Sequence, residues 1–196
     1  EQGKQSVNSA VSKGAYCYFV IDRDGNVHQN FPLDRWGYHA GESAWKGLSG
    51  TVSNELVGIE IQNAGKLRDY WKDGRDKKHT CPEGKLAAWF TRPDKGDAYF
   101  DKEEDARYGS DDDNIQRGWY HKYSVEQERA LEELLLWLKS NNPKVFDLDL
   151  VLGHDEVAGP KGIGRKRKSD PGASLSMTMT EFRKYLKKMY EDKYGK

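Results

Sequence analysis

Cysteine, long apolar runs and net charge are all scarce in this sequence, and each scarcity excludes a class of protein. Cys17 and Cys81 are the only cysteines; they allow at most one disulfide and lack the paired spacing of a structural zinc site. No stretch approaches the ~18 apolar residues of a membrane-spanning helix, and none near the first residue resembles a signal peptide. The 32 basic residues balance the 32 acidic residues, which leaves no overall attraction for nucleic acid. We therefore expect neither a membrane span nor a nucleic-acid partner.

The chain is long enough for a core and rich in aromatic residues. Its 196 residues predict a single domain, 1–196. Its aromatic content of 12% excludes a disordered chain, because aromatic rings need a core or a ligand surface. We expect this domain to be a monomer.

Three segments have the composition of β-strands. Residues 15–22 and 27–32 flank an Asp-Gly turn, in which Gly25 supplies the positive φ of a tight hairpin. Residues 56–62 form a short, nearly continuous apolar run, typical of a strand buried on both faces, with one acid, Glu60, inside it. Residues 149–153 predict a further strand.

Two capping boxes predict the starts of two long helices. Ser124 with Gln127 begins a helix that ends near Asn142, and its leucines fall on one stripe. Thr178 with Glu181 begins the last helix. Strands that alternate with long amphipathic helices favour an α/β fold built in layers.

Residues 64–118 differ from the rest of the chain. Of these 55 residues, 25 carry formal charge, and no helical or strand period persists. The aromatic residues among them indicate a segment that packs against something. We interpret 64–118 as a charged surface insertion and not as a second domain.

The strongest chemical signal is His154, directly after the predicted strand 149–153, followed by Asp170 before Pro171. A neutral imidazole and a carboxylate both suit Zn²⁺, and a rigid element holds a ligand in place. The same residues would also fit a hydrogen-bonded loop histidine and a turn-forming aspartate. The basic run 165–168 would equally fit a solvated patch or a nuclear-import signal.

Two further features are candidates for chemistry. Glu60 inside an apolar strand has a desolvation cost, which a partner, a metal-bound water or a raised pKa would offset; otherwise it faces solvent at a sheet edge. The loop from Trp36 to Trp45, with His39 among glycines, has the composition of a surface that stacks on sugars or peptides. Alternatively, its tryptophans anchor the loop.

Taken together, these motifs resemble the type 2 zinc-dependent N-acetylmuramoyl-L-alanine amidases, which include phage endolysins and peptidoglycan recognition proteins. The matching stretches stand in the family's order: YFVIDRDGNV (18–27), YHAG (38–41), VGIEI (57–61), GHDEVA (153–158) and KSDPG (168–172). Each is weak alone, but five in order are specific, and together they span most of the chain outside 64–118. The resemblance implies a mixed central sheet flanked by helices, with a zinc site in a groove.

The resemblance also assigns roles to four residues. His154 and Asp170 match zinc ligands, Glu60 matches the acid that handles the proton of the attacking water, and Lys168 matches the cation that steadies the oxyanion. These residue types suit amide hydrolysis independently, because it needs an activated water, a base and stabilisation of the tetrahedral intermediate. The bond cleaved would join N-acetylmuramic acid to L-alanine.

The substrate of such an enzyme would be peptidoglycan or a muropeptide. His39, Trp36 and Trp45 would line the groove for glycan and peptide. The resemblance implies a secreted, cell-wall or periplasmic bacterial protein, or a phage lytic enzyme.

One family feature is missing from its expected place. The family's first zinc histidine lies on an opening strand, upstream of the segment that matches Tyr18 to Gly25, and no histidine precedes Tyr18 here. Either the sequence begins after that strand, or His28 or His39 substitutes. The remaining alternative is a recognition domain that has lost its metal and binds peptidoglycan without catalysis.

Overall fold

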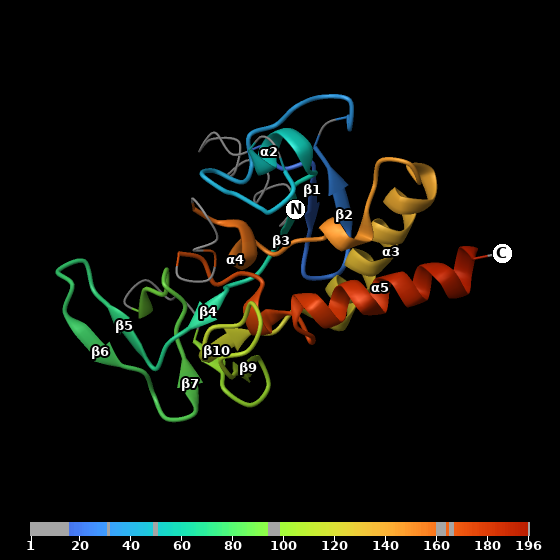
Figure 1. Cartoon of the computed structure of the whole chain (residues 1–196). Coiled ribbons are helices and arrows are strands. Elements are labelled where there is room, and N and C mark those ends of the chain that lie inside the picture. Colours follow the sequence, from blue (N-terminus) through green and yellow to red (C-terminus); the bar gives the residue numbers. More distant parts are fainter. Residues whose placement is uncertain are drawn as a thin grey trace.

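The structure is a computed structural model of the chain (Figure 1). It describes residues 16–30, 32–48, 51–93, 99–159, 164 and 167–195. Part of the basic run (Arg165 and Lys166), most of the preceding glycine-rich loop and all residues before Tyr16 lie outside this description.

The central sheet is mixed, as predicted. It has the order β2-β1-β3, with β1 (Phe19–Ile21) antiparallel to β2 (Val27–Gln29) and parallel to β3 (Ile59–Ile61). The hairpin between β1 and β2 is confirmed, and Gly25 has a φ of 81°. A side chain at that position would also meet the backbone oxygen of Glu126 at 2.7 Å, so glycine is required twice over.

Two long helices pack against this sheet, and both predicted capping boxes are present. α3 (Val125–Asn141) begins at the Ser124–Gln127 box, and α5 (Met179–Tyr194) begins at the Thr178–Glu181 box. The helices lie side by side (Figure 1). The main core joins Ile21 of β1 to apolar side chains of both helices: Leu131, Leu135, Phe182 and Leu186.

Two strand predictions need correction. Residues 149–153 form no ladder strand: the 3-10 helix η2 (Leu148–Leu150) leads through an extended stretch to the short helix α4 (His154–Val157). His154 therefore begins a helix. In the described part of the chain β3 is an edge strand and only partly buried, so its apolar residues do not indicate burial on both faces.

The segment 64–118 folds mostly as short strands. The strands β4 (Lys66–Leu67), β10 (Gly118–His121) and β9 (Ala106–Gly109) form a three-stranded sheet in that order. Two small hairpins complete the segment: β5 (Tyr70–Lys72) with β6 (Lys78–Thr80), and β7 (Lys85–Leu86) with β8 (Phe100–Asp101).

This segment has an apolar cluster of its own, which includes Leu67, Leu86 and Ala106. In Figure 1 the β5–β6 hairpin projects from the body of the molecule, whereas β9 and β10 lie against the 3-10 helix η5 (Gly172–Ser174) and the start of α5. The remaining helix, α2 (Val52–Glu55), is a single turn. Among the described residues, no helix has the length and apolar character needed to cross a bilayer.

Candidate active site

The site is built where α4 begins and where the chain returns at residue 170. The Gly153 N–H donates a hydrogen bond to Glu156 Oε2 at 2.9 Å, which caps the first turn of α4. The Asp155 N–H donates to the backbone oxygen of Asp170 at 2.8 Å and ties the two segments together. As a result, His154 Nδ1 lies 3.1 Å from Asp170 Oδ2.

That separation fits a shared metal ion. Two ligands that each lie about 2.0–2.1 Å from a tetrahedral Zn²⁺ stand about 3.3 Å apart. The side chains are 32% and 54% exposed, so an ion can reach both. Within the described ranges, no group of three or more His, Cys, Asp and Glu residues is placed to hold a metal. Among the described residues, His154 and Asp170 are therefore a two-residue donor set.

Glu60 lies in the middle of β3, close enough to His154 and Asp170 for their charges to affect its pKa. Its residue surface is exposed, but neighbouring protein still desolvates the carboxyl, and this raises its pKa. The charge of Asp170 raises the pKa further, whereas His154 and Lys168 oppose the shift. The aspartate behaves in the opposite way. Burial acts to raise the pKa of Asp170, but the hydrogen bond from His154 and the charges of His154 and Lys168 outweigh it, so the pKa is lowered.

A groove of about 1280 Å³ is lined in part by Glu60, His154, Lys168 and Asp170. Segment 64–118 contributes to its wall through Lys66, Arg68 and Trp89. A short chain of hydrogen bonds crosses from this wall to the loop that carries Lys168 and Asp170, here called the ligand loop. Lys66 Nζ donates to Gln116 Oε1 at 3.1 Å, and Gln116 Nε2 donates to the Lys168 backbone oxygen at 3.2 Å.

The aromatic loop contributes unequally to the groove. His39 lines it, and burial, together with the charge of His154, lowers the pKa of its imidazole against the effect of its hydrogen bond to Gly37. Trp45 packs against the apolar cluster of Ala40, Val52 and Val157, as an anchoring tryptophan would. Trp36 is 61% exposed and does not line the groove.

His28 lies outside the groove, and the two cysteines form no disulfide. His28 contacts Asp22 at 3.0 Å on the hairpin and does not line the groove. Cys17 and Cys81 are both free and buried. Cys17 lies at the groove, where burial and then the charge of Glu60 raise the pKa of its thiol to about 11.

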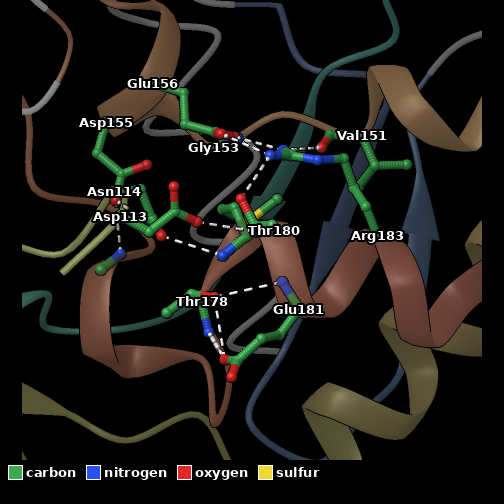
Figure 2. A network of polar contacts seen from close by, with 12 residues as sticks. Asp113, Asn114, Val151, Gly153, Asp155, Glu156, Thr178, Thr180, Glu181 and Arg183 are labelled. Atoms are coloured by element: carbon green, nitrogen blue, oxygen red, sulfur yellow. Dashed lines mark hydrogen bonds and ion pairs between the residues drawn. The ribbon is translucent and has the colours of Figure 1, made fainter.

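Two residues next to the candidate ligands were not predicted from the sequence. Asp155 is 1% exposed, and its Oδ2 accepts a hydrogen bond from Asn114 Nδ2 at 2.7 Å (Figure 2). Asp155 stands inside the GHDEVA motif, so its position was visible. Nothing in the sequence around Asn114 indicated that it would reach residue 155.

Comparisons with known proteins bear on the family and the fold. The N-acetylmuramoyl-L-alanine amidase family matches residues 1–173. No curated protein matches the chain significantly. A solved structure, the N-acetylmuramyl-L-alanine amidase AmiD from E. coli in complex with the substrate anhydro-N-acetylmuramic acid-L-Ala-D-gamma-Glu-L-Lys, has a similar fold, with a TM-score of 0.50 and 16% sequence identity. That match covers 87% of this chain and 48% of AmiD, so the chain spans about half the length of this relative. The α/β fold with a mixed sheet is confirmed, and the chain belongs to the N-acetylmuramoyl-L-alanine amidase family.

Proposed function

We propose that this chain is a zinc-dependent peptidoglycan hydrolase that cleaves the amide between N-acetylmuramic acid and L-alanine. The observation that carries the proposal is the gathering of His154, Asp170, Glu60 and Lys168 around one groove in a member of an amidase family. These residues come from β3, α4 and the loop before η5, so only the fold brings them together.

His154 and Asp170 would hold the metal. Their donor set of imidazole nitrogen and carboxylate oxygen suits Zn²⁺, and the lowered pKa of Asp170 keeps its carboxyl ionised, the form that binds metal. When bound, zinc supplies a Lewis acid that polarises the scissile carbonyl and activates water at neutral pH.

Glu60 and Lys168 would act on the substrate. Glu60 accepts a proton from the attacking water and returns it to the leaving amine, and a carboxyl with a raised pKa is better suited to both transfers. The Lys168 ammonium stabilises the negative charge that develops on the carbonyl oxygen. His39 would contact the glycan or peptide from the groove wall, and Trp36 and Trp45 remain predicted substrate contacts. The reaction would take place at the bacterial cell wall.

Turnover of a defined muropeptide tests this function. We expect the zinc-loaded full chain to release the stem peptide, with one new L-alanine amine for each bond cleaved. Removal of zinc by a chelator, or Glu60→Ala, should abolish release, and added zinc should restore it in the chelated sample only. Metal-independent release, or full activity of the Glu60 variant, would reject the mechanism.

A second function, peptidoglycan recognition without catalysis, is favoured by one observation: the described part of the chain brings together fewer than three potential ligands. Metal content and binding distinguish the two functions. A purified chain that binds muropeptide tightly, contains no zinc and takes none up would be a recognition domain. His154→Ala should lower zinc uptake and His28→Ala should not; the reverse result would place the metal on the hairpin.

A further inference from the structure

Asn114, near the end of the 64–118 segment, is buried and bonds both α4 and the start of α5. Both polar ends of its side chain are hydrogen-bonded: Nδ2 donates to Asp155 Oδ2 at 2.7 Å, and Oδ1 accepts from the Met179 N–H at 3.0 Å (Figure 2). Asn114 is 4% exposed, so water has little access to replace either hydrogen bond. One amide thus joins the segment to two separate parts of the fold.

Asp155 connects this amide to both candidate ligands. It directly follows His154, and its Oδ2 also accepts from the Gly172 N–H at 2.9 Å, just beyond Asp170. Its own N–H donates to the Asp170 backbone oxygen at 2.8 Å. Asp155 therefore links the start of α4, which carries His154, to residues 170 and 172.

Close packing leaves Asp155 little freedom to move. Its Oδ1 has no hydrogen-bond partner among the described residues and lies so near Gly153 that a Cβ there would come within 2.3 Å. On the other side, Gly172 packs under the ring of Tyr120 from β10, and a Cβ on Gly172 would also come within 2.3 Å of that ring. The Tyr120 ring thus packs against Gly172, while Asn114 of the segment bonds Asp155.

We propose that Asn114 is a positioning residue that, through Asp155, sets the relative placement of His154 and Asp170 and hence the metal affinity of the site. The proposal rests on the proposed function in so far as it takes these two residues as ligands. Outer hydrogen bonds orient metal ligands, and their loss typically costs 10–100-fold in affinity. Removing Asn114 would also leave a buried carboxylate with one donor fewer, which favours a shift of the loop. The charged segment is then part of the site's framework.

Asp113 offers a matched control. It is the neighbour of Asn114, and its Oδ2 accepts from the Thr180 N–H at 2.9 Å, on the same first turn of α5 (Figure 2). Asp113→Ala removes a contact with the helix start, whereas Asn114→Asp keeps an acceptor for the Met179 N–H but replaces the donor to Asp155 with a second carboxylate. These variants separate support of the helix from positioning of the ligands.

The test measures zinc affinity of the full chain by competition with a chelator of known affinity. We expect Asn114→Ala and Asn114→Asp to weaken zinc binding about tenfold or more, and Asp113→Ala to change it by less than about threefold. If both Asn114 variants bind zinc as the wild type does, or if Asp113→Ala weakens binding equally, the proposal is wrong.

A second measurement does not depend on the metal. Hydrogen exchange of the Asp155 and Gly172 amides in the zinc-free chain should accelerate at least tenfold in both Asn114 variants and stay unchanged in Asp113→Ala. Exchange at the core residues Phe182 and Leu186 verifies that each variant is folded. If the wild type binds no zinc, the proposed function fails, and the exchange of these two amides alone decides the positioning role: unchanged exchange overturns it.

Discussion

His154 Nδ1 lies 3.1 Å from Asp170 Oδ2, although 16 residues separate them in the chain. Two hydrogen bonds stabilise this arrangement. The Asp155 N–H donates to the Asp170 backbone oxygen, and the Gly172 N–H donates to Asp155 Oδ2. Two metal-binding atoms that already lie at the separation of metal ligands need little rearrangement when an ion binds, and this favours a high affinity for the ion.

Glu60→Gln should separate catalysis from metal binding. The amide keeps the size of the side chain but cannot accept the proton of the attacking water, so we expect kcat to fall about 10²–10⁴-fold. Zinc affinity and KM should change little. In the wild type the base must be ionised, and its pKa is raised, so activity should fall on acidification at a higher pH than for an ordinary glutamate. Steady-state kinetics of wild type and variant across pH 5–8 (about three units) measure the fall in kcat and the pH at which activity is lost. An undiminished kcat in Glu60→Gln would contradict the role of Glu60 as the base.

Lys168→Met should lower kcat without weakening substrate binding. The ammonium stabilises charge that exists only in the transition state, and loss of one such group costs about 10²–10³-fold in kcat. Arg167→Met is the control, because it removes an adjacent cation that pairs instead with Glu42 at 3.0 Å. Equal losses in the two variants would mean that general positive charge, and not the position of Lys168, matters.

Arg183→Met should destabilise the fold. Arg183 binds both oxygens of Glu156, at 2.9 and 3.0 Å, and Glu156 caps α4 through Gly153. The side chains are only 14% and 8% exposed, so removing one partner leaves a nearly buried charge, at a cost of about 3–5 kcal/mol. Arg129→Met removes a helix-surface pair with Glu133 and should cost less than about 0.5 kcal/mol. Urea unfolding measures both free energies, and similar values would refute the difference in burial as the cause.

His121 should make the free energy of unfolding depend on pH. Its Nδ1 accepts a hydrogen bond from the Ala64 N–H at 3.1 Å, and burial, followed by the charge of Arg23, lowers its pKa to about 4. Between about pH 6.5 and pH 4 the unfolded chain binds a proton that the folded chain does not, so stability falls as pH falls through this window, by about 2–3 kcal/mol in total.

His121→Asn isolates this effect from other titrating groups. The asparagine side-chain oxygen can replace Nδ1 as the acceptor and does not titrate. The unfolding free energy of the wild type minus that of the variant should therefore fall on acidification from pH 7 to pH 4 (about three units). A difference that stays constant across this range would assign the acid sensitivity to other groups.

Features encoded over a few residues were predictable. The hairpin at Gly25 and the two capping boxes depend on backbone conformation and on hydrogen bonds between residues three or four positions apart, which a sequence displays directly. The strand predicted at 149–153 failed for the opposite reason. A strand needs a partner for its backbone groups, and the described residues provide none there, so the apolar run leads instead through an extended stretch into α4.

The ordered motifs alone were enough to identify the family, the mixed α/β fold and the residues worth testing, because each motif keeps its chemistry within a short stretch. Which of those residues face one groove depended on folding. So did the pairing of Asn114 with Asp155, which lie 41 positions apart. Such contacts arise because burial leaves a polar group no solvent partner and forces it to find one wherever packing places it. That physical requirement underlies our proposal that a charged segment with no recognisable period supports the candidate ligands.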